Sequence, residues 1–260
     1  MAVFFRFVWV IAYREFLRFI QDKTRMISSF SMPLLFLVIF GAGFGKLIGQ
    51  MTPGVNYIQF MYPGILAMTV LMTSIMSGVS IVWDREFGFL KELLVSPLSR
   101  SGVLVGKAIG AAAIAIIQGA IMLVLAPFLN VSITPGTVLA LLPLLLILSL
   151  SLSGLGLLIG ARMRSQQGFH LLMQLVIFPM MFLSGIFFPI SGVATWLEVL
   201  SKLNPVTYGI DAIRQVFLGS EVAGVTVFGH TMNILESALV VAAVGVVLLS
   251  AAIWVFNRQE

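Results

Sequence analysis

The sequence predicts an all-α polytopic membrane protein with six transmembrane helices. Hydrophobic residues make up 60% of the 260 residues and charged residues only 10%, and a soluble domain of this length needs more charge to stay in solution. Five long stretches also contain no charged residue, and a transmembrane span needs about 20 consecutive, mainly apolar residues. These stretches are residues 26–45, 47–83, 108–161, 165–197 and 237–257.

The stretch 108–161 is too long for one helix. It divides at Pro127 and at residues 130–136, where Pro and Gly signal a turn. The predicted spans are about residues 26–48, 58–82, 104–128, 137–160, 169–188 and 235–256. Six spans place both termini on one side of the membrane.

Basic residues predict which side that is. Twelve of the fifteen Lys and Arg residues fall on the side of the termini, and only Lys46, Lys202 and Arg214 fall on the other. Because basic loops stay inside, we expect both termini to be cytoplasmic and the chain to lie in the cytoplasmic (inner) membrane. The net charge of +5 then follows from topology, and we expect no nucleic-acid partner.

Residues 1–25 predict an interfacial amphipathic helix. Polar residues recur on one face at helical spacing, and apolar residues occupy the other. The polar set is Arg14, Arg18, Gln21, Asp22 and Arg25, and the apolar set is Phe5, Val8, Trp9, Ala12, Phe16, Phe19 and Ile20. Such a helix lies among lipid headgroups with its aromatic side chains buried. It is either a membrane anchor or a helix that flanks a gate and moves with a partner.

Residues 84–95, between the second and third spans, predict a short surface helix on the cytoplasmic side. Asp84 can cap a helix that begins at Arg85, and Ser96-Pro97 ends it. Phe87, Leu90 and Leu94 share one face, and charges of both signs surround it. This helix either docks into a cleft of a soluble protein or is a solvated connector that rests on the membrane.

Two motifs carry a family resemblance. Residues 85–100 (REFGFLKELLVSPLSR), followed by Gly106-Lys107, resemble the ABC-2 family of ABC-transporter permeases, in particular its daunorubicin-resistance and nodulation-factor export type. A second match runs over 182–190 (FLSGIFFPI), 203–208 (LNPVTY) and 211–214 (DAIR). The resemblance implies that residues 84–95 are a coupling helix that contacts a separate ATP-binding subunit. Its candidate contact residues are Asp84, Arg85, Glu86, Phe87, Gly88, Leu90, Lys91, Glu92 and Leu94.

Residues 189–234 are too polar to span the membrane. The resemblance implies external re-entrant helices that close the outer mouth of a pathway before the last span, since irregular backbone at membrane depth must be covered by protein or water. The alternative is an amphipathic cap on the interface. The candidate outer-gate residues are Phe188, Pro189, Asn204, Pro205, Tyr208, Asp211 and Arg214.

The fifth span is rich in Met and Phe. Methionine adapts to varied apolar shapes, so these residues either line a pathway for a lipid-like or drug-like substrate or form ordinary lipid-facing surface and bundle core. The candidate pathway residues are Met72, Thr73, Met76, Phe178, Met181 and Phe182. Glycine pairs four residues apart, such as Gly106–Gly110 and Gly156–Gly160, permit close helix contact, and we expect that contact within the chain.

The chain lacks the motifs of an energy-converting site. It has no G-x-x-x-x-G-K-[ST], which a P-loop needs, and no cysteine. His170 and His230 stand alone, so we expect no catalytic residue, no metal site and no cofactor bound by this chain.

The predicted function is a non-catalytic permease subunit of an ATP-driven exporter for a hydrophobic or amphipathic substrate, such as a drug-like molecule, a lipid or a glycolipid. The resemblance implies two copies of an ATP-binding subunit that hold ATP and Mg²⁺, and a second permease subunit, alike or related. Membrane lipids are further partners. The alternatives are an exporter of polysaccharide or lipid-linked glycans, a passive channel-like protein and a membrane enzyme acting on lipids.

Overall fold

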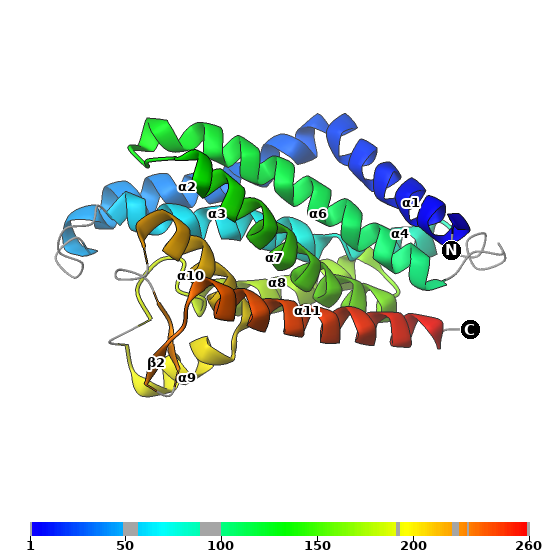
Figure 1. Ribbon diagram of the computed structural model, residues 1–260. Helices are drawn as coiled ribbons and strands as arrows, with labels where there is room; N and C mark the ends of the chain where they lie inside the picture. Colours follow the sequence, from blue (N-terminus) through cyan, green and yellow to red (C-terminus); the bar gives the residue numbers. More distant parts are fainter. Residues whose placement is uncertain are drawn as a thin grey trace.

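The computed structural model describes residues 2–48, 57–88, 100–190, 193–219, 224–227 and 229–258. Most of these residues are helical, and the long helices form one bundle (Figure 1). In chain order the elements are α1 (Ala2–Gln21), α2 (Lys23–Ile48), α3 (Tyr57–Met76), α4 (Val79–Glu86), α6 (Arg100–Leu125), η1 (Ala126–Leu129), α7 (Pro135–Arg162), α8 (Gln166–Phe182), α9 (Thr195–Leu203), α10 (Pro205–Leu218), β1 (Thr226–Val227), β2 (His230–Thr231) and α11 (Ile234–Asn257).

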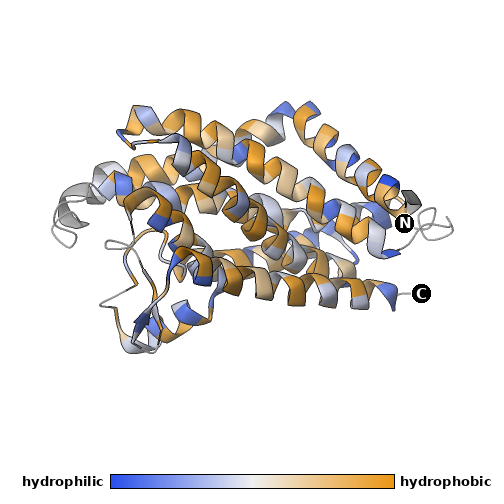
Figure 2. Cartoon of the chain, viewed as in Figure 1, coloured by the Kyte–Doolittle hydropathy of each residue, from blue (hydrophilic) through white to orange (hydrophobic). Residues whose placement is uncertain are grey.

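Four helical segments of the described chain are long and apolar enough to cross a membrane. They are Tyr57–Glu86, Arg100–Leu129, Pro135–Arg162 and Ile234–Asn257. A fifth candidate is a helix pair bent by 70°, Phe4–Gln21 with Met26–Gly41. Figure 2 shows hydrophobic residues along these helices and hydrophilic residues gathered toward the ends of the bundle. The chain is therefore a mostly helical, polytopic membrane protein with four or five candidate spans among its described residues, where the sequence predicts six.

The long apolar stretch 108–161 is interrupted where its turn signals lie. The 3₁₀ turn η1 contains Pro127, and Asn130 adopts a left-handed backbone with φ 56°, a conformation that Asn tolerates. Thr134 then caps α7 by accepting a hydrogen bond from the Thr137 N–H at 3.1 Å. A capped start fixes where α7 begins.

α7 crosses the break between α3 and α4 at a glycine contact. A Cβ atom added to Gly156 would lie 2.0 Å from the Ile75 carbonyl oxygen, and one added to Gly160 would lie 2.4 Å from the Gly78 carbonyl oxygen. No side chain fits in that space, so the backbones touch. The pair Gly156–Gly160 therefore makes a close helix contact within the chain, as the four-residue spacing predicts.

α1 packs against α6 rather than presenting one apolar face to lipid. Val8 and Phe19 are buried, whereas Phe5 and Trp9 are 67% and 68% exposed, so the predicted apolar face is divided between protein and surroundings. A Cβ atom on Gly106 would meet the Ile11 Cβ at 2.7 Å. The glycines of α6 thus allow α1 to pack closely against it.

The segment before the last span is folded against the bundle. α10 packs on α3, α7 and α11, and every residue from Val206 to Gln215 is buried. It lies with α9 and the β1–β2 hairpin at the end of the bundle away from the termini (Figure 1). α10 is therefore enclosed by neighbouring parts of the chain from Val206 to Gln215.

Candidate functional site

The last turn of α4 holds three of the predicted contact residues, Asp84, Arg85 and Glu86. The prediction that Asp84 caps a helix beginning at Arg85 is wrong, because both residues lie inside α4 (Val79–Glu86), which continues the line of α3. The apolar run that precedes Asp84 keeps the chain helical up to this point. This helix ends at Glu86 with Phe87 as its C-cap, and Gly88 follows with φ +77°, the left-handed conformation that glycine supplies after a helix.

Asp84 lies in a buried ion cluster, defined by Asp84, Lys107, Glu15 and Arg14, where α1, α4 and α6 meet. The Lys107 Nζ lies 2.7 Å from Asp84 Oδ2 and 3.2 Å from Glu15 Oε1. It also donates to Ser80 Oγ at 2.8 Å. The Lys107 side chain is only 1% exposed and the Asp84 side chain 7%. The Asp84 carboxylate is therefore bound within the chain and offers little surface to a partner.

Arg14 supplies the second positive charge of the ion cluster. Its guanidinium lies 3.4 Å from both Asp84 Oδ2 and Glu15 Oε1, so two carboxylates are balanced by two cations. One turn further along α1, the Arg18 guanidinium stacks over the Trp83 ring at 4.3 Å. Buried charges persist only when they are paired in this way.

Arg85 and Glu86 bind the junction between α7 and α8. Arg85 donates to the carbonyl of Ala161 at 2.7 Å and to the carbonyl of Met163. Glu86 accepts the Gln166 N–H at 2.9 Å and also the Gln166 side-chain amide. The carbonyls that end α7 and the N–H groups that begin α8 lack partners within their helices. Three consecutive residues of α4 thus fasten it to α1, α6, α7 and α8.

Phe87, directly after α4, is a highly exposed contact residue, with 78% of its surface exposed. A pocket of about 470 Å³ lies beside it, between α1 and α4. Its lining residues are Arg14, Leu17, Arg18, Gln21, Trp83, Asp84 and Phe87. The predicted contact residues Leu90, Lys91, Glu92 and Leu94 lie outside the described residues.

The candidate pathway residues fall into two groups. Met72, Thr73 and Met76 line a pocket of about 180 Å³ together with Phe19, Ser28 and Ser29. On α8, Phe178 and Phe182 are 44% and 41% exposed, whereas Met181 is fully buried in the core. The structure therefore brings the α3 residues together at one pocket and separates Met181 from any open surface.

Asn204, Pro205 and Tyr208, among the outer-gate candidates, shape the start of α10. Asn204 accepts the Val206 N–H at 3.1 Å and donates to the Met180 carbonyl at 2.6 Å, and Pro205 occupies the first helical position. The Tyr208 hydroxyl donates to the Lys202 carbonyl at 2.7 Å. These contacts tie α10 to α8 and α9.

Asp211 and Arg214 bind different partners. Asp211 accepts hydrogen bonds from Ser237 Oγ at 2.9 Å and from the Val225 N–H at 3.0 Å. Arg214 donates to the Gly185 carbonyl at 2.6 Å. Both line a pocket of about 100 Å³ that also includes Pro189, while Phe188 packs on the bundle core. Asp211 and Arg214 are thus buried and join α10 to neighbouring segments of the chain.

Sequence analysis did not predict that Lys107, Glu15 and Arg14 meet Asp84 in an ion cluster. Lys107 is the one charged residue of the predicted span 104–128, and a charge within a span is a signal of a paired or functional group. Its carboxylate partners lie far away in sequence, so the pairing itself has no local signal. In the part of the chain that the structure describes, no group of three acidic or histidine residues is arranged to hold a metal ion.

The apolar bundle defines the class as a polytopic membrane protein, and comparison with known proteins identifies its family. The profile of the ABC-2 type transporter family matches residues 6–218. The chain is 32% identical over 221 residues to ycf38 of Cyanophora paradoxa, named as a transport permease, covering 82% of this chain and 75% of ycf38. It is 31% identical over 228 residues to the inner membrane transport permease YadH of Escherichia coli K12, covering 85% and 86% of the two chains.

Nodulation protein J of Rhizobium leguminosarum bv. viciae is 27% identical over 202 residues, covering 77% of each chain. The chain belongs to the ABC-2 type transporter family, and it is a membrane transport component of an ABC transporter. Permeases of this kind are generally not catalytic. The family resemblance read from residues 85–100 and 182–214 is therefore confirmed.

Proposed function

We propose that this chain is the transmembrane permease subunit of an ATP-driven exporter that moves a hydrophobic or amphipathic substrate outward. Its six spans are α2, α3 with α4, α6, α7, α8 and α11, and its termini are cytoplasmic in the inner membrane. Two features support this topology. Basic residues are concentrated on one side, and the start of α1 and the end of α11 lie at the same end of the bundle (Figure 1).

The observation that carries the proposal is the set of contacts that joins the last turn of α4 to its neighbouring helices. Asp84 is bonded to Lys107 of α6, while Arg85 and Glu86 are bonded to the ends of α7 and α8. A partner that binds next to Glu86 and moves it therefore pulls on several helices at once. Phe87, highly exposed at this point, is the side chain that enters the partner, while Asp84 acts inside the permease.

The partner is a separate ATP-binding subunit, present in two copies and carrying ATP and Mg²⁺. A second permease subunit, identical or related, completes the transporter. Substrate contacts involve the pocket lined by Met72, Thr73 and Met76, whose flexible thioethers suit varied apolar molecules. Its lining combines the apolar side chains of Phe19, Met72 and Met76 with the hydroxyl groups of Ser28, Ser29 and Thr73, which supports an amphipathic, lipid-like or drug-like cargo.

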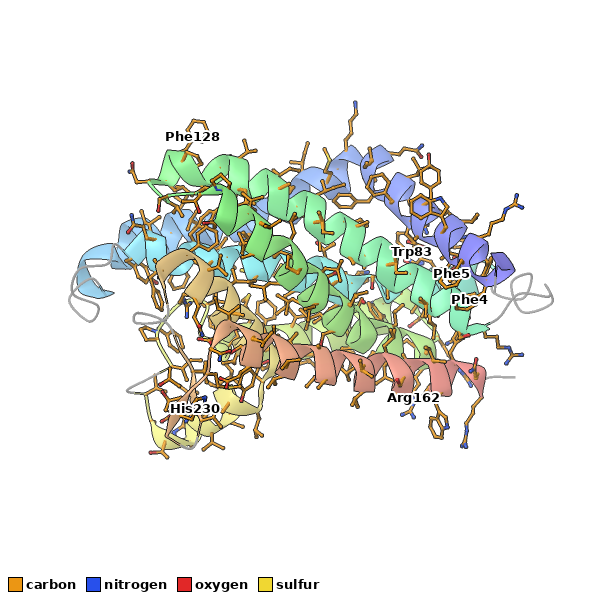
Figure 3. All side chains as sticks on the ribbon, in the orientation of Figure 1. Phe4, Phe5, Trp83, Phe128, Arg162 and His230 are labelled. Atoms are coloured by element: carbon orange, nitrogen blue, oxygen red, sulfur yellow. The ribbon has the colours of Figure 1, made fainter. Side chains whose placement is uncertain are left out.

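The test is to look for an ATP-binding subunit in the neighbouring reading frames and to co-express it with this chain. We expect the two to co-purify and to hydrolyse ATP. Phe87→Glu should weaken co-purification about tenfold, because a charge replaces a buried anchor of the interface. Phe128→Glu is the matched control, since Phe128 is 83% exposed and lies toward the end of the bundle opposite Trp83 (Figure 3). Failure of the native pair to co-purify, or equal loss in both variants, would overturn the proposal.

A further inference from the structure

We infer that Lys107 is a positioning residue that holds α1 and α4 together as one unit, so that α1 follows any movement of residues 84–88. The inference rests on the proposed function for the source of that movement, a separate ATP-binding subunit. The tie between the two helices is a property of the chain alone.

The first support is the geometry of one ammonium group. Lys107 Nζ reaches Glu15 of α1 at 3.2 Å, Asp84 of α4 at 2.7 Å and Ser80 of α4 at 2.8 Å. An ammonium has three donors, and all three are used.

The second support is how α1 is attached. α1 packs closely against α6, where a Cβ atom added to Gly110 would lie 2.9 Å from the Glu15 Cβ. Among the described residues no comparable backbone packing joins α1 to α4. Side chains make that link, namely the ion cluster and the stacking of Arg18 on Trp83.

The third support is the charge balance. Without Lys107, the carboxylates of Asp84 and Glu15 would share the single guanidinium of Arg14. Like charges in a low-dielectric site separate or draw in water. Because Asp84 is set in a helix that is fastened to α7 and α8, α1 is the element that would yield.

The absence of cysteine from the sequence allows spin labels to be placed at chosen positions. Trp9→Cys on α1 and Phe87→Cys next to α4, both highly exposed, report the distance between the two helices by pulsed electron paramagnetic resonance in lipid nanodiscs, without any partner. We expect one narrow distance distribution in the labelled parent and a distribution about twice as broad in Lys107→Met, because a buried partner has been removed.

A second variant keeps the inference testable if Lys107→Met does not fold. Asp84→Asn combined with Lys107→Met removes one charge of each sign and leaves Arg14 paired with Glu15. The double variant should therefore fold while lacking the contacts of Lys107 with α1 and α4. Lys202→Met is the matched control, because Lys202 pairs with Glu198 at 2.6 Å on the surface of α9. Broadening in the double variant but not in the control supports the inference. An unchanged distribution in the double variant overturns it.

The complex with the ATP-binding subunit provides the second measurement. Labels at Trp9→Cys and at Trp254→Cys on α11, which is 54% exposed, leave Phe87 intact for docking. We expect ATP to shift this distance in the parent complex and not in the complex of the double variant, and an equal shift in both overturns the inference. If no complex forms, the proposed function fails, and the measurement on the chain alone still decides whether Lys107 ties α1 to α4.

Discussion

The ammonium of Lys107 lies 2.7 Å from the carboxylate of Asp84, and both side chains are buried where three helices meet. Charges within membrane-embedded bundles are costly unless they are paired. This pair therefore joins α6 to the last turn of α4 with a contact that cannot be broken without exposing or stranding a charge. The adjacent residues Arg85 and Glu86 extend the same fastening to α7 and α8.

Removal of the Asp84 carboxylate should destabilise the chain. We expect Asp84→Leu to lower the free energy of unfolding by about 3 kcal/mol, because it leaves part of the Lys107 charge unpaired in a buried site. Denaturant unfolding in detergent, followed by circular dichroism, measures the change. Glu198→Leu breaks a half-exposed pair with Lys202 and should cost no more than about 1 kcal/mol. Equal losses in the two variants would contradict a special role for the buried pair.

The contact of α7 with the α3–α4 break should tolerate no side chain. Gly156→Ala would put a methyl group 2.0 Å from the Ile75 carbonyl oxygen, so the helices must separate at a cost of at least about 1–3 kcal/mol. Gel filtration and thermal unfolding of the purified variant measure this loss. Gly43→Ala, with no atom within 4 Å of the added group, is the control, and it should behave like the native chain or better.

Arg214 should hold the loop after α8 to α10. Its guanidinium donates to the Gly185 carbonyl at 2.6 Å and stacks on the Phe60 ring at 4.0 Å. We expect Arg214→Met to cost about 2–3 kcal/mol, because a charge-assisted hydrogen bond is lost and a buried carbonyl is left unpaired. Hydrogen exchange should rise in residues 183–190. Arg162→Met, at an exposed position, should leave exchange there unchanged, and a native pattern in Arg214→Met would refute the role.

The pocket between α1, α2 and α3 should be reachable from outside the protein. Met76 lines that pocket of about 180 Å³, whereas its neighbour Ile75 is fully buried. In this cysteine-free chain, Met76→Cys should react with a thiol reagent at least about tenfold faster than Ile75→Cys, since reactivity follows exposure of the thiolate. Mass spectrometry of the labelled protein gives the two rates. Equal rates would remove Met76 from the candidate pathway.

The proposed orientation predicts which thiols an impermeant maleimide reaches in intact cells. Phe128→Cys should be labelled from outside, and Phe87→Cys only after the membrane is opened. Phe128 lies toward the end of the bundle opposite Trp83 (Figure 3), and Phe87 follows Trp83 by one helical turn at the end of α4. His230→Cys, in the segment at the end away from the termini (Figure 3), should follow Phe128→Cys. The reverse pattern would invert the topology.

Much of the architecture was predictable from local sequence. The interruption of 108–161 follows from Pro127 and the turn residues after it, and the four-residue glycine spacing predicted that Gly156 makes a close helix contact within the chain, though not that α3 is its partner. The N-terminal segment was only partly predictable. Its helical periodicity is present, but periodicity did not reveal that Val8 packs on protein while Trp9 stays exposed, because both satisfy the same apolar pattern.

Residues 84–88 were predicted to contact a partner, and that role stays a prediction. Asp84, Arg85 and Glu86 lie in the last turn of α4 and bind other helices, whereas Phe87, directly after the helix, is 78% exposed. A charged residue near the end of a span reads from sequence as a surface residue. Whether such a residue is buried instead depends on a partner in the folded chain, and here the partners of Asp84, Arg85 and Glu86 come from distant parts of the sequence.

The sequence by itself determined that this chain is a helical membrane protein of the ABC-2 type transporter family, because hydropathy over about 20 residues and a family motif are local properties. The tertiary structure decided which side chains meet. Lys107 finds Asp84 and Glu15 only because α1 and α4 both pack beside α6. Because that arrangement depends on how the helices pack against one another, helix packing decides which charged residues are buried in ion pairs.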